Sequence, residues 1–160
     1  MEVLESINYE AAYELERGKP MPSKNHNRLQ IMLAFVLMQK YDELYDILSE
    51  ADLELSTGWA VPDLVIYPKL EYDWIHDEIK MTQVPITTIE ILSPKQSIAD
   101  LVIKAKDKFL AAGVKSSWII VPPLKQITIL YPDGTSENYT TGLITDKVTG
   151  VEIELDQIFR

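Results

Sequence analysis

Apolar residues along the chain follow helical spacing in two stretches and strand spacing in most of the others. In the first helical stretch, five residues recur at i, i+3 and i+4 positions: Leu29, Met32, Leu33, Val36 and Leu37. Ser23 or Asn25 can cap this helix, and we expect it to run to about residue 48. A short N-terminal segment precedes it and ends at Gly18-Lys19-Pro20-Met21-Pro22.

Three runs after this helix have the composition of β-strands. Residues 53–55 alternate with polar neighbours, whereas residues 61–67 are almost all apolar, which is typical of a strand covered on both faces. Residues 85–92 are rich in β-branched side chains and end at Ser93-Pro94. Between these last two runs, residues 72–80 have a mixed pattern that predicts a loop and a short strand.

A second helical stripe spans residues 97–112 and stops at Gly113. More strands are expected after it, at 117–121 and 126–131, in a hairpin partner near 137–140, and in an edge strand with a last turn near 151–159. The order of helix, three strands, helix and further strands predicts an α/β fold.

The composition narrows the class of protein. A chain of 160 residues, 46% of them hydrophobic and 25% charged, has the size of one compact domain, so residues 1–160 are expected to form a single domain. The absence of cysteine excludes disulfides and thiolate metal ligands. The first residues lack the basic start and apolar core of an export signal, and no stretch approaches the length of a membrane span. We therefore expect a soluble, cytoplasmic protein.

The formal net charge of −10 argues against a protein that coats nucleic acid over a long track. Local charge differs from this total. From Lys95 to Lys115 the sequence has five lysines and two aspartates, which gives a local net charge of +3. This stretch is interpreted either as a solvated helix face or as a source of cations for a site that acts on phosphate.

Two carboxylates stand where apolar packing gives no reason for them. Asp63 lies near the start of the run 61–67, and Glu90 lies inside the run 85–92. Neighbouring strands could bring the two acids together, and close carboxylates need a divalent cation between them or a shared proton. A site with oxygen ligands only suits Mg²⁺ or Mn²⁺. Such an ion can activate a water molecule and stabilise charge that develops on a phosphate.

A nearby lysine would assist that chemistry, and the second helix offers three candidates: Lys104, Lys106 and Lys108. Helical angles alone do not decide which of them turns inward. Structural alternatives exist for each charged residue. Asp63 could be a turn acid that opens its strand, Glu90 could be neutralised by a structural lysine, and Lys104 could pair with Asp100 at the helix surface.

Three blocks of the sequence resemble the Uma-two family of putative restriction endonucleases, which belongs to the PD-(D/E)xK nuclease superfamily. The blocks are Pro62-Asp63-Leu64-Val65-Ile66-Tyr67-Pro68, Ile89-Glu90-Ile91-Leu92-Ser93-Pro94-Lys95-Gln96 and Gly113-Val114-Lys115-Ser116-Ser117-Trp118. The similarity covers most of the chain and includes the segment from Gly18 to Ser23 and His26. The combination of three blocks is specific, whereas a single block would not suffice.

The resemblance implies a restriction-endonuclease-like core, in which helices flank a central mixed sheet. It also implies that Asp63 and Glu90 are metal ligands and that a backbone carbonyl near Ile91 completes the inner shell. The superfamily's lysine usually follows the second acid by two residues, but Leu92 stands there in this chain. In this family the lysine stands on the next helix, which corresponds to Lys104, although helix geometry could favour Lys106 or Lys108. His26 either has a positioning role or simply starts its helix.

Two functional hypotheses follow. The first is a metal-dependent endonuclease, a phosphodiester hydrolase that acts on DNA with Mg²⁺ or Mn²⁺ and uses Asp63, Glu90 and Lys104 for catalysis. The second is a non-catalytic interaction protein, a homodimer that retains the nuclease core as a scaffold. Aromatic residues in less regular segments could form its interface: Trp59, Trp74 and Tyr131.

Overall fold

The computed structural model describes the backbone of residues 2–160 and the side chains of residues 9–160. Its centre is a six-stranded sheet whose spatial order is β1 (Tyr45–Ser49), β4 (Leu64–Pro68), β6 (Thr87–Ile91), β7 (Ser116–Val121), β8 (Gln126–Leu130) and β9 (Ser136–Tyr139). Strands β6 and β7 run parallel, and every other neighbouring pair is antiparallel. The sheet is therefore mixed, as the family resemblance implies.

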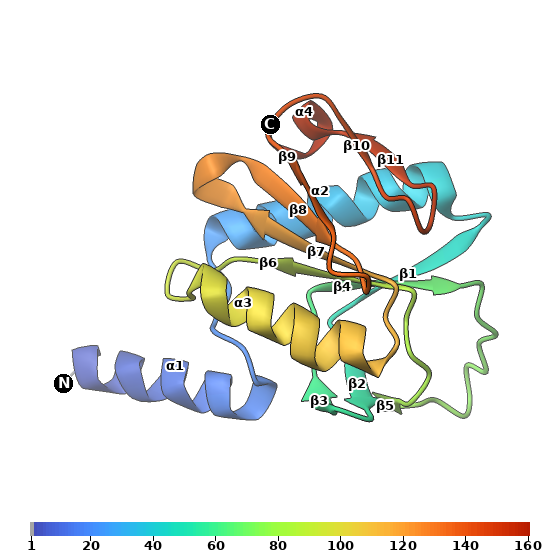
Figure 1. The fold of residues 1–160 in the computed structure, drawn as a ribbon. Helices are drawn as coiled ribbons and strands as arrows, with labels where there is room; N and C mark the ends of the chain where they lie inside the picture. Colours follow the sequence, from blue (N-terminus) through green and yellow to red (C-terminus); the bar gives the residue numbers. More distant parts are fainter. Residues whose placement is uncertain (1) are drawn as a thin grey trace.

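Helices cover both faces of this sheet (Figure 1). On one face, α2 (Lys24–Tyr41) packs its buried residues against the even-numbered side chains of β7, Trp118 and Ile120. On the other face, α3 (Ile98–Lys104) packs Leu101 against Ile119. The alternation along β7 thus separates two hydrophobic layers, as expected for a strand that is buried on both faces.

The helix that starts with α3 continues to residue 112 but changes its hydrogen-bonding pattern. A π-helical turn, η1 (Ala105–Phe109), follows α3, and a 3₁₀ turn, η2 (Leu110–Ala112), ends the helix. Gly113 stops it with φ +109°, a conformation that glycine adopts without strain. The predicted range 97–112 is therefore confirmed, although the helix is not a regular α-helix.

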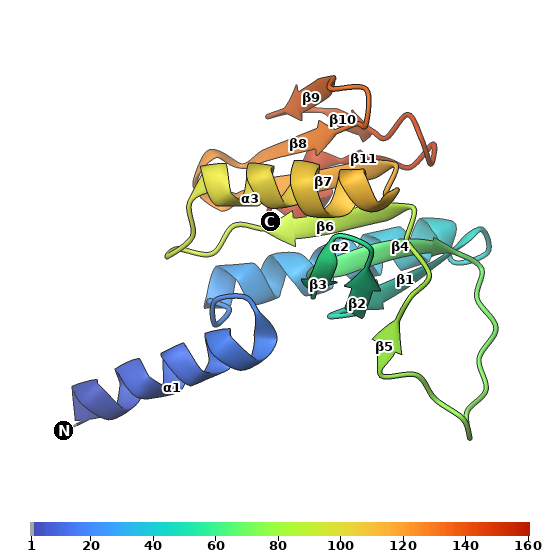
Figure 2. The same ribbon diagram turned by 60° about the horizontal axis from the view of Figure 1, so that its bottom comes forward.

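Smaller elements surround the main sheet (Figure 2). One side sheet has three strands, β3 (Gly58–Ala60), β2 (Asp52–Leu55) and β5 (Lys80–Met81). A two-stranded sheet joins β10 (Leu143–Thr145) to β11 (Glu152–Glu154). The remaining short helices are η3 (Pro122–Leu124) and α4 (Leu155–Ile158). No helix in the described part of the chain is long and apolar enough to cross a membrane.

Several predicted boundaries were wrong. The first predicted helix ends at Tyr41 rather than near residue 48, because residues 45–49 form β1 and pair with the edge of β4. The predicted strand 61–67 begins only at Leu64. The tail strand pairs with β10 and does not extend the main sheet.

The segment before Gly18 is a helix that the sequence pattern did not reveal. Helix α1 (Glu2–Arg17) lies apart from the sheet in both views (Figures 1 and 2). Its side chains Tyr9 and Leu15 are 67% and 85% exposed. Since hydrophobic periodicity identifies helices that bury one face, a helix with exposed apolar residues gives no such signal.

Candidate active site

The pairing of β4 with β6 brings the two predicted acids together. Leu64 lies opposite Ile89 at the end of this antiparallel pair, and Asp63 and Glu90 are the residues next to them on the outward side. Asp63 is 0% exposed and Glu90 is 4% exposed. The backbone N–H of Ile91 donates to Oδ2 of Asp63 at 2.7 Å, which fixes that carboxylate against β6.

Two basic side chains from before β1 also reach Asp63. Lys19, in the segment between α1 and α2, forms an ion pair with Oδ1 of Asp63. His26, in the first turn of α2, places Nε2 at 3.0 Å from Oδ2. Lys19 and His26 are only 6% and 2% exposed. Asp63 therefore has partners for both oxygens, which offsets the cost of burying its charge.

Among the three candidate lysines, Lys104 is the one that reaches the acids. Its Nζ lies 2.8 Å from Oε1 of Glu90. Lys106 is exposed, and Lys108 donates to the backbone oxygen of Trp59 at 2.9 Å. The structure thus brings Lys104 into contact with Glu90 rather than with Asp100 at the helix surface.

Burial and neighbouring charges shift the pKa values of Asp63 and Glu90 in opposite directions. Burial alone would raise the pKa of Asp63, but the hydrogen bond with His26 and the charge of Lys19 hold that pKa below its ordinary value. Burial raises the pKa of Glu90, and the negative charge of Asp63 raises it further. The positive charge of Lys104 lowers this pKa but does not offset the other two effects, so the pKa stays above its ordinary value. Two acids with opposite shifts are typical of sites in which close carboxylates repel each other.

The pKa of Lys19 is also shifted. Burial would lower it, but the negative charges of Asp63 and Glu90 outweigh burial and raise the pKa of this lysine above its ordinary value. Its ammonium therefore stays charged between carboxylates. A second acid, Glu50, contacts the same ammonium at 3.2 Å through Oε2.

The neighbours of Glu50 complete the charged cluster. Arg17 approaches Oε2 of Glu50 at 3.3 Å, and Nε2 of Gln30 donates to Oε1 at 3.1 Å. The same Gln30 amide donates to the backbone oxygen of Asp63 at 3.1 Å. Sequence reasoning missed Lys19, Glu50 and Gln30 as members of the site. The family resemblance was the one signal that pointed to the segment around Lys19.

One ring nitrogen of His26 has no hydrogen-bond partner among the described residues. An ionised carboxylate only accepts hydrogen bonds, so Nε2 carries the hydrogen that points to Asp63. Nδ1 is buried and makes no hydrogen bond within the described part of the chain. Because Ser23 caps α2 by accepting from the His26 backbone N–H at 3.3 Å, the ring is held at a fixed helix start. This arrangement fits the positioning role that was one of two interpretations of His26.

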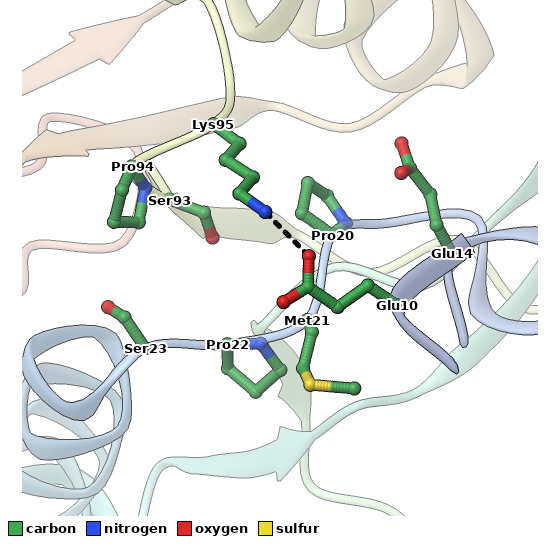
Figure 3. Close-up of a pocket in the computed structure, with 9 residues that line it drawn as sticks. All are labelled: Glu10, Glu14, Pro20, Met21, Pro22, Ser23, Ser93, Pro94 and Lys95. Atoms are coloured by element: carbon green, nitrogen blue, oxygen red, sulfur yellow. Dashed lines mark hydrogen bonds and ion pairs between the residues drawn. The ribbon is translucent and has the colours of Figure 1, made fainter. Parts of the chain in front are cut away.

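A pocket of about 260 Å³ is lined in part by the segment that follows Lys19 (Figure 3). Its walls come from α1, from the segment after Lys19, and from the loop after β6: Glu10, Glu14, Pro20, Met21, Pro22, Ser23, Ser93, Pro94 and Lys95. Lys95 crosses it to reach Glu10 at 2.5 Å. Helix α1 therefore forms one wall of this pocket.

The oxygen ligands present are of the right kind for a hard dication. Carboxylates and backbone carbonyls are the ligands that Mg²⁺ and Mn²⁺ prefer, and Mg²⁺ commonly binds one or two carboxylates and keeps several waters. Among the described residues, no group of three or more His, Cys, Asp or Glu residues is arranged to hold a metal ion. Two carboxylates alone, Asp63 and Glu90, would leave the remaining ligands of such an ion to a carbonyl, water or substrate.

The chain is similar to a solved structure of known fold class. A crystal structure of a putative nuclease belonging to DUF820 from Anabaena variabilis matches it with a TM-score of 0.76 and 22% sequence identity. The match covers 88% of this chain and 83% of that chain. This likeness shows the fold, an α/β restriction-endonuclease-like core with a central mixed sheet flanked by helices.

The family follows from a second comparison. The model of the Uma2 family, described as putative restriction endonuclease, matches residues 2–158. The chain belongs to this family, as the three sequence blocks predicted. No curated protein matches the chain. Family and fold together support a nuclease, an enzyme class that hydrolyses phosphodiester bonds.

Proposed function

We propose that this chain is a divalent-metal-dependent DNA endonuclease, a cytoplasmic enzyme whose residues 1–160 act as one domain. The observation that carries the proposal is the convergence of two buried carboxylates, Asp63 and Glu90, with Lys104 bound to the second of them. Membership of the Uma2 family and the nuclease-like fold support it.

In this proposal Asp63, Glu90 and a backbone carbonyl near Ile91 would hold Mg²⁺ or Mn²⁺. Such an ion, when bound, would lower the pKa of water and offset negative charge on the phosphate. The protein's own contribution is to fix the ligands. Asp63 is held by the Ile91 N–H and by His26, so its carboxylate keeps one orientation relative to Glu90.

In this proposal Lys104 acts on the phosphate from its place beside Glu90. Its ammonium lies 2.8 Å from Oε1 of Glu90, and 20% of its side chain is accessible to solvent. From this position it can donate to a phosphate oxygen while negative charge develops there. Phe109 lies under the same ammonium, with Nζ 5.5 Å from the ring centroid, and limits where the lysine can move.

The proposal is tested by assaying plasmid DNA cleavage with millimolar Mg²⁺ or Mn²⁺. We expect wild-type protein to cleave, and Asp63→Asn and Glu90→Gln to lose at least about 100-fold in rate. Lys104→Met is expected to lose about 100-fold or more for the same electrostatic reason. Lys40→Met provides the matched lysine control, because Lys40 lies at the end of α2 and donates to the backbone oxygen of Glu152 rather than to an acid.

Asp46→Asn provides the matched control for the acids. Asp46 is a buried acid of β1, 7% exposed, that pairs with Lys69 outside the site. The Asp46→Asn variant is expected to cleave DNA at the wild-type rate, and circular dichroism verifies that it is folded. Undiminished cleavage by Asp63→Asn and Glu90→Gln would refute the proposed site. Wild-type protein that binds neither ion at millimolar concentration would refute the metal dependence.

A second candidate function is a non-catalytic homodimer that keeps the nuclease core. The observation in its favour is a stripe of exposed apolar residues on α2, in which Ile31, Phe35 and Met38 are 66%, 57% and 46% exposed. Trp74 is also 89% exposed, whereas Tyr131 is buried and contributes to the core. Light scattering combined with a metal titration separates the two functions, because a tight dimer indifferent to metal favours the scaffold.

A further inference from the structure

We propose that Lys19 is a built-in competitor of the metal ion: its ammonium holds Oδ1 of Asp63 and transfers to Glu50 when a divalent cation binds. This inference rests on the proposed metal site. It assigns a role to the contacts of Lys19 with Asp63 and Glu50, which the proposed catalytic roles leave unexplained.

The first step of the argument is that both oxygens of Asp63 have partners. Oδ2 accepts from the backbone N–H of Ile91 at 2.7 Å and lies 3.0 Å from Nε2 of His26. The Ile91 N–H belongs to the backbone of β6 and cannot withdraw without breaking that strand, and the His26 ring is buried at the capped start of α2. Among the described residues, Lys19 is the partner that holds Oδ1. A carboxylate oxygen can accept two partners, so a cation that binds Asp63 must either share Oδ1 with the Lys19 ammonium, at a cost in charge repulsion, or displace it.

The second step is that Lys19 already touches its alternative partner. Its Nζ lies 3.2 Å from Oε2 of Glu50, so a rotation of the side-chain end suffices to leave Asp63. Glu50 is itself fixed relative to Asp63, since its backbone N–H donates to the Asp63 carbonyl at 3.1 Å. Gln30 bridges the same two residues. The receiving carboxylate thus stays in place while the ammonium moves.

The third step is that the backbone of Lys19 is anchored on both sides. Gly18 has φ +70°, and a Cβ added there would lie 2.8 Å from the Trp59 ring, so only glycine fits without a shift. Pro20 restricts the backbone on the other side. The flexible part is therefore the four-carbon stem of the lysine, which carries a compact charge on rotatable bonds.

Electrostatics then sets the direction of the effect. An ammonium and a dication repel each other when both lie beside the same carboxylate, and this repulsion is strong in a buried site. Lys19 therefore weakens metal binding, whereas Glu50 strengthens it by drawing the ammonium away. Removal of the lysine charge and removal of the Glu50 charge should change the metal affinity in opposite directions.

The test is isothermal titration of the full chain with Mn²⁺. We expect Lys19→Met to bind Mn²⁺ about tenfold more tightly than wild type, and Glu50→Gln to bind it several-fold more weakly. Lys147→Met removes the same charge from an exposed lysine that pairs with Glu137, and it should leave the affinity unchanged. In EDTA, Lys19→Met should also unfold at a lower temperature than wild type, because Asp63 loses a buried partner.

The outcomes separate this inference from the proposed function. If wild type and Lys147→Met bind Mn²⁺ but Lys19→Met binds it equally or more weakly, the competitor role is overturned and the metal site stands. Equal or tighter binding by Glu50→Gln overturns the role as well, and this variant decides the matter if Lys19→Met does not fold. If wild type binds no Mn²⁺, the proposed function falls and this inference falls with it.

Discussion

Buried acids in this protein fall into two kinds, which differ in their partners. Asp146 is 0% exposed, and its two oxygens accept from donors that fix a turn against β7: Ser116, Trp118 and the backbone N–H groups of Val148 and Thr149. Such an acid needs no cation, because hydrogen bonds satisfy it locally. Asp63 differs because a second buried acid, Glu90, lies beside it. The pair, rather than burial of one carboxylate, distinguishes the candidate site.

Asp46 allows a prediction about pH at the scale of one residue. Its Oδ1 lies 2.8 Å from Nζ of Lys69, and its Oδ2 accepts from the backbone N–H of Leu70 at 2.5 Å. Burial would raise the pKa of Asp46, but these hydrogen bonds outweigh it and hold the pKa below the ordinary value of 3.8. A carboxyl with a lowered folded-state pKa adds stability above its unfolded pKa, and this stability is lost as the pH falls through the folded value.

We therefore expect Asp46→Asn to lower the melting temperature at pH 7, and the difference from wild type to shrink below about pH 4. Thermal unfolding of both proteins, monitored by circular dichroism, measures this difference in melting temperature. The pH is varied from 3 to 7 in steps on the order of one pH unit. A difference between the two proteins that stays constant over that range would show that the ionised form of Asp46 contributes no stability.

At the scale of elements, the helix that starts with α3 shows why the buried positions of a helix can be predicted from sequence while its α- or π-helical geometry cannot. Leu101, Ala105 and Phe109 are all buried and are spaced four residues apart. In an α-helix of 3.6 residues per turn, each step of four residues rotates the side chain by about 40°. The wider π-turn at 105–109 offsets this drift, so Phe109 stays in the core. Sequence periodicity identifies the buried positions but tolerates either geometry.

The π-turn carries a second prediction. Deletion of Lys106 removes the extra residue of this turn, so we expect a regular α-helix in which Phe109 lies three residues after Ala105 and stays on the same face, within its cluster with Val65 and Tyr67. The loss of stability should therefore stay well below the roughly 3–5 kcal/mol typical of truncating a buried Phe. Urea denaturation measures this loss. The substitution Lys106→Ala keeps the chain length and should change stability little, since Lys106 is exposed. A deletion variant that loses about 3–5 kcal/mol would contradict this account.

The site residues that the sequence did not reveal are those that reach Asp63 only when distant elements come together in the folded chain. Asp63 and Glu90 were recognisable because each stands inside an apolar run, and neighbouring strands bring such positions together. Lys19 and His26 meet Asp63 across 44 and 37 residues of sequence. Lys19 precedes the helix as one lysine between a glycine and a proline, and no local pattern marks it as buried. Its burial depends on how the segment between α1 and α2 approaches Asp63, which periodicity does not encode.

At the scale of the whole molecule, charge limits how this protein can bind DNA. The chain carries a formal net charge of −10, so most of its surface repels phosphates. The segment 95–115, with its five lysines, is the local exception. It includes α3 and the π-turn, which cover the same sheet face that presents Glu90. Any DNA contact should therefore be short and centred on this helix.

A short contact has a measurable signature in its salt dependence. The logarithm of the binding constant falls with the logarithm of salt concentration with a slope of about −0.9 per neutralised phosphate, so at most five lysines give a slope no steeper than about −4.5. Fluorescence anisotropy with labelled duplex DNA and the Glu90→Gln variant measures this slope.

Adding Lys106→Glu to that variant should weaken DNA binding and make the slope shallower by about one or two. Lys40→Glu serves as the control, because Lys40 lies at the end of α2, on the other sheet face, and contacts the Glu152 carbonyl. A slope much steeper than about −4.5, or equal effects of the two variants, would mean that DNA binds over a surface other than the α3 face.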